Sequence, residues 1–157
     1  MFLIVFLVVI DGLAGTYETT DGGRIGLKSI DGSPHKRDGA LGPGKNLRWA
    51  DLQKANLHKA NLCFTDLRNA NLDDSDLTDA DLHGAAIGGA SLCNANLELC
   101  SFSGADLDGA DFSGAVNWKK AKWKGARYKQ DAEPRWPKGF TPAKAGIIVV
   151  KSPEPRP

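Results

Sequence analysis

The sequence has little of what would place it in several common classes of protein. Its 157 residues include three cysteines, too few and odd in number for a disulfide-stabilised scaffold. No apolar run reaches about 18 residues, which excludes a helix that spans a membrane. The chain also lacks an excess of charge of either sign, because 20 Lys and Arg against 19 Asp and Glu leave a formal net charge of +1. This balance argues against a generally basic nucleic-acid binder, and 41% hydrophobic residues suffice for the core of one domain.

The near-neutral total conceals a segregation of charge along the chain. Residues 45–116 hold eleven acids and five bases, whereas residues 117–157 hold eleven bases and three acids. No Lys or Arg occurs from Asn69 to Trp118. We therefore expect an acidic middle region joined to a basic C-terminal region.

A five-residue repeat fills the middle of the chain. Leucine, replaced three times by Ile or Phe, occupies every fifth position from residue 47 to residue 112, which makes fourteen consecutive matches. Two positions before it stands a small residue, usually Ala, and between these two stands mostly Asp or Asn. The repeating unit is therefore A-(D/N)-L-x-x.

A period of five fits neither an α-helix nor a β-strand, because in both the leucines would point to different sides. They stay on one side only if the chain turns a corner after each unit. Four corners of about 90° close one coil, and each coil stacks on the next coil at the strand spacing of about 4.8 Å. The large residue and the small residue two positions before it then both point inward. We expect the core to be lined by Leu57, Leu62, Leu67, Leu72, Leu77, Leu82, Ile87, Leu92, Leu97, Phe102, Leu107 and Phe112.

These repeats resemble those of the pentapeptide-repeat family. The resemblance implies an all-β fold, a right-handed quadrilateral β-helix, here of about four coils over residues 45–130. The register slips by one residue between Ala115 and Trp118, after which Trp118, Trp123 and Tyr128 continue at spacing five as centres of a terminal coil. The tail over residues 131–157 is basic and proline-rich, and its Trp and Phe side chains are expected to cover the open apolar end of the coil.

The N-terminal segment leaves three interpretations open. The apolar run in residues 1–15 reads as a signal peptide with a small-x-small site at Gly12–Ala14, as a strand that caps the first coil, or as a wrongly chosen start or weak anchor. A signal peptide would place the protein in the periplasm or outside the cell, and its absence would place it in the cytoplasm. Residues 16–44 are rich in Gly and Asp and are expected to form an irregular N-terminal cap.

The candidate chemical motifs favour structural roles. Gly39–Lys45 matches G-x-x-x-x-G-K, but no Ser or Thr follows and β-helix repeats take the place of a helix, so we interpret it as an entry turn. Five acids that could suit Ca²⁺ fall on different faces of a square coil, and the three histidines lack ligands at zinc spacing. We assign no catalytic, cofactor-binding or metal-binding residue. The surface candidates for an interaction are Asp73, Asp74, Asp76, Asp79 and Asp81 and the basic group Lys119, Lys120, Lys122 and Lys124.

Function must then lie on the outer faces, because Leu and Ala fill the interior and leave no room for a substrate. We expect a non-enzymatic scaffold or protein–protein interaction module without a cofactor, whose partner is another protein. We do not expect a small-molecule substrate, nucleic acid or a membrane as partner, apart from a signal segment, and a dimer remains open. The resemblance also implies an alternative, an acidic mimic of DNA that modulates a type II topoisomerase such as gyrase and protects it from quinolones.

Overall fold

The computed structural model describes residues 16–18, 24–26, 28–29 and 42–151. Near the N-terminus, β1 (Thr16–Glu18) pairs antiparallel with β2 (Arg24–Gly26), and β3 (Lys28–Ser29) pairs antiparallel with β4 (Ala50–Asp51). A 3₁₀ turn, η1 (Trp118–Lys120), precedes the last two strands, β5 (Arg127–Lys129) and β6 (Ile148–Val150), which pair in parallel. The interpretations of residues 1–15 lie outside the described residues.

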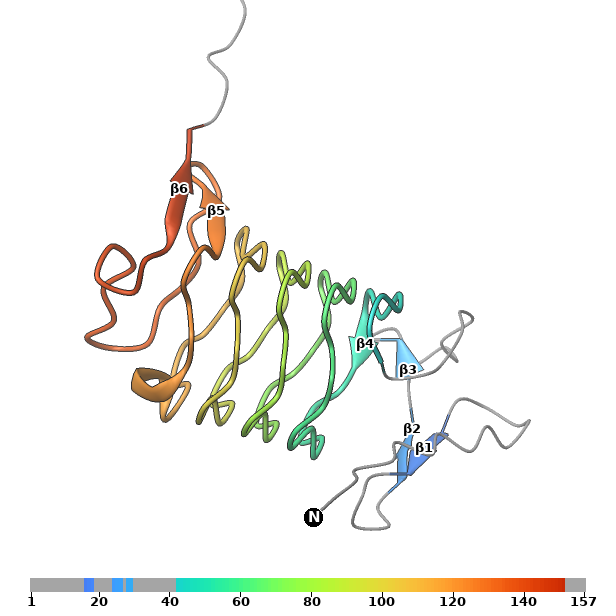
Figure 1. The fold of residues 1–157 in the computed structure, drawn as a ribbon. Coiled ribbons are helices and arrows are strands. Elements are labelled where there is room, and N and C mark those ends of the chain that lie inside the picture. Colours follow the sequence, from blue (N-terminus) through green and yellow to red (C-terminus); the bar gives the residue numbers. More distant parts are fainter. Residues whose placement is uncertain (1–15, 19–23, 27, 30–41, 152–157) are drawn as a thin grey trace, which may run out of the picture.

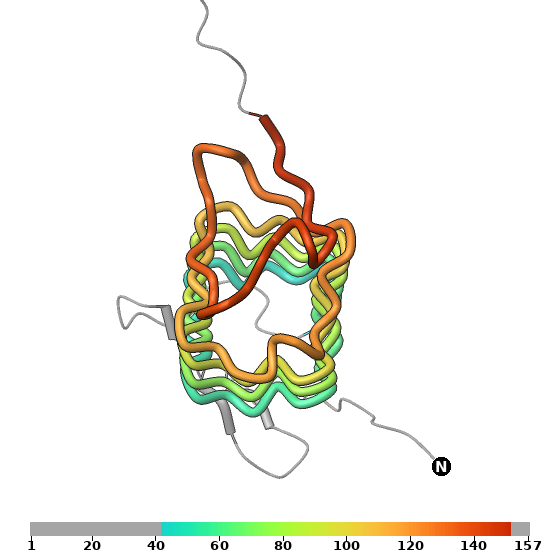
Figure 2. The backbone as a smooth tube through the Cα atoms, turned by 90° about the vertical axis from the view of Figure 1, so that its left-hand side faces the viewer, coloured from blue at the N-terminus to red at the C-terminus, as the bar shows by residue number. Residues whose placement is uncertain are grey.

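The five-residue repeats form a β-helix (Figure 1). Parallel bridges join residues twenty positions apart, from Asn46 and Asp66 to Asn96 and Val116, with one bridge per repeat and therefore four per coil. At each bridge the backbone of one coil is hydrogen-bonded to the backbone of the next coil. The Leu57 amide, for example, donates to the Asp76 carbonyl at 2.8 Å, and the Asp76 amide donates to the Ala55 carbonyl at 2.9 Å. Viewed along its axis, the backbone encloses a four-sided outline (Figure 2).

The interior of the coil is packed with the large and small residues of the repeat. All twelve residues assigned to the core lining are at most 2% exposed. The alanines two positions before them are also buried, and Thr65, Ser75 and Cys100 take the same place at 0–1% exposure. One large and one small side chain per repeat therefore fill the space that each coil encloses.

The corners of the coil are tight turns that the repeat builds from its own backbone. In all fourteen units the second residue after the central one has a positive φ, between 56° and 73°. The turn is closed by a bond such as that from the Ala60 amide to the Leu57 carbonyl, at 2.9 Å. A positive φ at this place is what a type II turn requires.

The Asp and Asn residues of the repeat stabilise these same corners. Each Oδ1 accepts a hydrogen bond of 2.9–3.3 Å from the backbone amide two residues later, an Asx turn. Eleven residues share this role, namely Asn46, Asp51, Asn56, Asn61, Asp66, Asn71, Asp76, Asp81, Asn96, Asp106 and Asp111. The middle residue of the unit is therefore polar because it holds the turn.

The last coil departs from the repeat where the sequence predicts a slip. Asn96 still pairs with Val116, but Ser101 pairs with Lys122, one residue further on, which confirms the one-residue shift. The extra residue, Asn117, has a φ of 56° and turns the chain into η1 instead of an extended side. The expectation that Trp118 is a buried centre is therefore wrong, because Trp118 is only partly buried at the start of η1, whereas Trp123 and Tyr128 are 4% and 6% exposed.

The tail crosses the end of the coil (Figure 2). Its aromatic side chains pack on those of the last repeats. Trp136 stacks on Phe112 with ring centroids 5.6 Å apart, and Phe140 stacks on Trp136 at 4.6 Å. Trp123 stacks in turn on Phe102 at 4.5 Å. A continuous aromatic cluster therefore joins the tail to the core.

Candidate interaction surface at the C-terminal end

The acidic candidates are distributed around the coil, and two of them accept hydrogen bonds from residues of the next coil. Asp73 accepts hydrogen bonds from Ser91 Oγ at 2.5 Å and from the Cys93 amide at 2.9 Å. Asp74 accepts one from Asn94 Nδ2 at 3.3 Å. The five residues fall at successive corners and sides, and the part of the chain that the structure describes has no group of three acids, Cys or His placed to hold a metal ion.

Two of the remaining acidic candidates serve the turns. Asp76 accepts from the backbone and side chain of Thr78, at 3.0 and 2.6 Å, and Asp81 accepts from the His83 amide at 2.9 Å. Asp79 is exposed at a corner with a φ of 56°. The described residues therefore form no metal site from these acids, and their role as an interaction surface stays a prediction.

The basic C-terminal region folds back on the acidic repeats. Lys120 pairs with Glu98 at 2.6 Å, Lys129 with Asp108 at 2.5 Å and Arg135 with Asp111 at 3.3 Å. The segregation seen along the sequence thus becomes a set of ion pairs between neighbouring coils. All three pairs are exposed enough that each adds little to stability.

These pairs alter the titration of the acids. Burial raises the pKa of Asp108, but hydrogen bonds and charge from Lys129 outweigh it and leave the pKa below its usual range. Asp111 behaves alike, because the bonds from Ser113 and the charge of Arg135 outweigh its burial and lower its pKa. Nearer the N-terminal end, the side-chain bond from Arg68 lowers the pKa of Asp66.

The predicted basic group is exposed at the C-terminal end of the coil. Lys119, Lys120, Lys122 and Lys124 are all exposed, and only Lys120 among them has an ion pair within the described residues. Lys119 Nζ lies 5.5 Å from the centre of the Trp118 ring, within the range of a cation–π contact.

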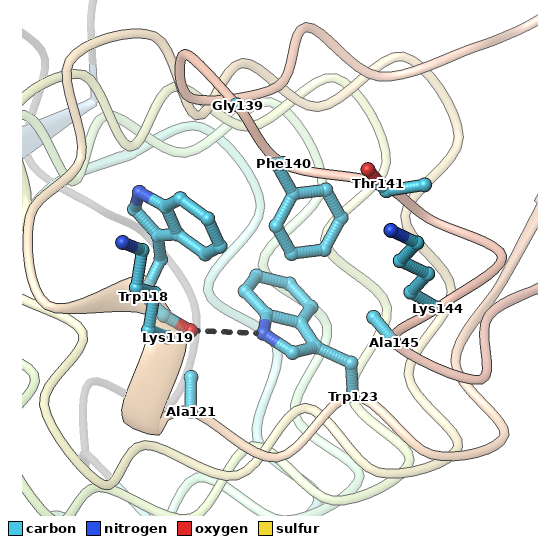
Figure 3. Close-up of a pocket in the computed structure, with 9 residues that line it drawn as sticks. All are labelled: Trp118, Lys119, Ala121, Trp123, Gly139, Phe140, Thr141, Lys144 and Ala145. Carbon is cyan, nitrogen blue, oxygen red and sulfur yellow. Dashed lines mark hydrogen bonds between the residues drawn. The ribbon is translucent and has the colours of Figure 1, made fainter.

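A cavity of about 350 Å³ opens beside this basic group, between η1 and the tail (Figure 3). The rings of Trp118, Trp123 and Phe140 form its apolar wall with the methyl groups of Ala121 and Ala145. Its polar lining comes from Lys119, Thr141 and Lys144. We call these residues, with Gly139, the C-terminal pocket.

Hydrogen bonds and ring contacts hold the walls of the C-terminal pocket in place. Trp123 Nε1 donates to the Trp118 carbonyl at 3.3 Å, as Figure 3 shows. Phe140 meets Trp118 and Trp123 edge to face, with centroids 5.3 and 5.1 Å apart. Sequence reasoning identified Lys119 but missed Phe140, Thr141 and Lys144 as site residues. The signal available was the aromatic and basic composition of residues 136–144, which has no period to indicate its geometry.

Other apolar side chains are exposed away from the C-terminal pocket, and one of them, Val150, lines a second cavity of about 210 Å³ with Tyr128 and Lys129. Phe64 is 65% exposed, yet its ring lies against Gly84, where an added Cβ would come within 2.6 Å of it. Ile148, Val149 and Val150 of β6 are 41–54% exposed at the end of the stack. No helix in the described part of the chain has the length and apolar character needed to cross a membrane.

The three cysteines are free thiols. Burial raises the pKa of Cys100, which occupies an inward small-residue position. Burial also raises the pKa of Cys63 and Cys93, which are only partly exposed.

Comparison with known proteins agrees with this architecture. The family described as pentapeptide repeats matches residues 46–84 and 80–116, with eight copies. A comparison with curated proteins finds no match.

Solved structures of the same kind resemble this chain. The pentapeptide repeat protein Rfr23 from the cyanobacterium Cyanothece 51142 is 29% identical, with a TM-score of 0.56, over 70% of this chain and 77% of that one. A pentapeptide repeat protein from the Arabidopsis thaliana thylakoid lumen is 26% identical, with a TM-score of 0.46, over 57% of this chain and 65% of that one. The protein alr5209 from Nostoc Pcc 7120 is 29% identical, with a TM-score of 0.41, over 73% and 85% of the two chains. The likeness to Rfr23 supports the β-helix fold.

Proposed function

Because residues 46–116 are pentapeptide repeats and make this chain a pentapeptide-repeat protein with a β-helix fold, we propose that it is a non-enzymatic interaction module that binds another protein through its outer surface. The proposal takes the coil to be right-handed, quadrilateral and about four turns long, as the family resemblance implies.

One observation carries the proposal, the contrast between the filled coil and the hollow at its end. Between residues 47 and 112 the inward side chains are at most 4% exposed. The C-terminal pocket, in contrast, combines an open apolar wall with exposed cations. Buried aromatic anchors in pockets with a polar rim are typical of the residues that dominate protein–protein binding.

The alternative of an acidic DNA mimic finds less support in this geometry. Nine acids lie between Asp73 and Asp111. Four of them accept Asx bonds, and Lys120, Lys129 and Arg135 each pair with one acid of this stretch. A supercoiling assay with DNA gyrase should therefore show no change at micromolar protein, and inhibition of supercoiling would favour the alternative.

Affinity capture tests the proposed function. The full chain is immobilised and exposed to native lysate, and retained proteins are compared by quantitative mass spectrometry with those on a Leu77→Lys bait. This substitution places an unpaired charge in the core and should unfold the coil. We expect a partner that saturates the native bait and is lost from the unfolded one. Equal retention by both baits, or no enrichment on either, would contradict the proposal.

A further inference from the structure

The lining of the C-terminal pocket has a particular chemical composition. Three aromatic rings and two alanine methyl groups supply the wall, and Lys119 and Lys144 are the only titratable side chains that the described residues contribute to it. No carboxylate from the part of the chain that the structure describes lines it. The pocket therefore favours a ligand that has an apolar group with a negative charge next to it.

The two lysines that line the pocket are available to a ligand, which Lys120 and Lys129 are not. Lys120 and Lys129 are held by Glu98 and Asp108, whereas Lys119 and Lys144 have no ion pair within the described residues. Both are exposed. A carboxylate near them would find an unoccupied cation on either side of the pocket.

The aromatic wall is set before any ligand arrives. The indole of Trp123 is fixed by its bond to the Trp118 carbonyl, and Phe140 is stacked on Trp136. The turn that carries Lys144 is closed by the bond from its amide to the Thr141 carbonyl, at 3.1 Å. A rigid wall lowers the entropy lost when a partner binds.

The size of the pocket restricts its occupant. Its volume of about 350 Å³ is at the lower end of ligand sites, which span roughly 300–1,000 Å³. It suits one large side chain, so the charged groups that accompany this side chain must remain at the rim beside the lysines.

We propose that the C-terminal pocket binds an acidic peptide segment of a partner protein. One aromatic or aliphatic side chain of the segment lies against Trp118, Trp123 and Phe140, and flanking carboxylates face Lys119 and Lys144. The inference rests on the proposed function and adds the chemistry of the partner. Charge complementarity selects a peptide of this kind over a basic or a neutral one.

Two double variants separate a specific site from general charge. Lys119→Glu with Lys144→Glu reverses the charge at the pocket. Lys54→Glu with Lys59→Glu makes the same change at two exposed corners of the first coil. All four lysines lie on the surface, so both variants should fold, which unchanged far-UV circular dichroism and melting temperature verify.

Selection from a displayed library of random heptapeptides provides the test. On the wild-type protein we expect enrichment of peptides with an aromatic or aliphatic residue between carboxylates. The best synthetic peptide should bind at least tenfold more weakly to the pocket variant and within twofold of wild type to the corner variant. No enrichment, enrichment of basic peptides, or equal loss in both variants would overturn the inference.

The indole signals in a ¹⁵N–¹H NMR spectrum locate the bound peptide. Addition of the selected peptide should shift the signals of Trp118 and Trp123 and leave that of Trp49, on the first coil, in place. Shifts confined to Trp49 would contradict the proposed site. Phenylacetate serves as a free carboxylate, and binding as tight as that of the peptide would overturn the choice of a peptide.

The two proposals fail in distinguishable ways. If a captured partner is retained equally by wild type and by the pocket variant, the interaction module stands and the pocket inference is wrong. If the native bait captures no partner, the interaction module itself is contradicted.

Discussion

At the scale of single residues, each position of the repeat has its own physical task. The central Leu fills the coil, and the small residue two positions before it leaves room for that Leu. The Asp or Asn between them points outward and holds the corner through its Oδ1. The residue at positive φ completes the turn, and nine of the fourteen units use a residue other than Gly there. The repeat therefore depends on its Asx turns more than on glycine.

Asp81 tests the Asx turn. Asp81→Ala removes the acceptor for the His83 amide and should lower the free energy of unfolding by about 1 kcal/mol. Asp81→Asn keeps an oxygen at the same place and should remain close to wild type. Urea denaturation of the three proteins measures the difference, and equal stability of the Ala and Asn variants would contradict this role.

The cysteines test burial at the same scale. Burial raises the pKa of all three thiols, so little thiolate is present at pH 8, and Cys100 is in addition closed off from solvent. Iodoacetamide should modify Cys63 and Cys93 slowly, and faster as the pH rises, while Cys100 reacts only in denaturant. Peptide mass spectrometry counts the adducts, and native modification of Cys100 at the rate of the other two would contradict its inward position.

At the scale of the structural element, the coil depends on the inward side chains of every fifth residue. Leu77 is 0% exposed, whereas Asp79, two residues on, is at an exposed corner in line with Lys59 of the preceding coil. The position of Leu77 therefore requires an apolar side chain, whereas the corner position of Asp79 is occupied by a lysine, Lys59, in the preceding coil.

A matched pair of lysine substitutions uses this contrast. Leu77→Lys should abolish the far-UV β signal and cooperative melting, because an unpaired ammonium in the core costs several kcal/mol of the total stability. Asp79→Lys should keep the far-UV β signal, and its melting temperature should stay within a few degrees of wild type. Survival of the Leu77→Lys variant with an unchanged melting curve would show that the side chain does not point inward.

The sequence pattern predicts the coil but not the pocket at its end. A strict period of five predicts the coil, its inward leucines and the slip after Ala115, because periodicity determines direction. The same pattern does not explain the Asp and Asn residues, since their role depends on backbone geometry in the turn. The C-terminal pocket has no period, and its walls come from Trp118 and Phe140, 22 positions apart in the sequence. Trp118 itself deviates because Asn117 inserts a 3₁₀ turn.

At the scale of the whole molecule, the charge segregation joins the basic C-terminal region to the acidic repeats. Acids of the last repeats pair with Lys120, Lys129 and Arg135, and the aromatic cluster around Trp136 packs beside them. The tail thus covers the apolar end while its remaining cations stay exposed around the C-terminal pocket.

These ion pairs predict the effect of acid on the tail. The pKa values of Asp108 and Asp111 are lower in the folded protein than the ordinary 3.8. Their contribution to stability is therefore complete above that value and is lost as the pH falls through the lowered folded pKa values. Because each exposed pair adds little, its loss should loosen the tail only slightly, and tryptophan emission should shift to the red by a small amount as the pH is lowered from 5 to 2.5. A variant with Asp108→Asn and Asp111→Asn should show a smaller acid-dependent shift, and an identical shift would contradict this coupling.

We propose that the molecule binds its partner through its C-terminal end, which the filled coil supports. The most direct test is the Kd of the captured partner for three proteins, wild type, the Lys119→Glu and Lys144→Glu variant, and the Lys54→Glu and Lys59→Glu variant. We expect binding at least tenfold weaker for the pocket variant and within twofold of wild type for the corner variant. Equal Kd values for all three proteins, or a larger loss in the corner variant, would contradict it.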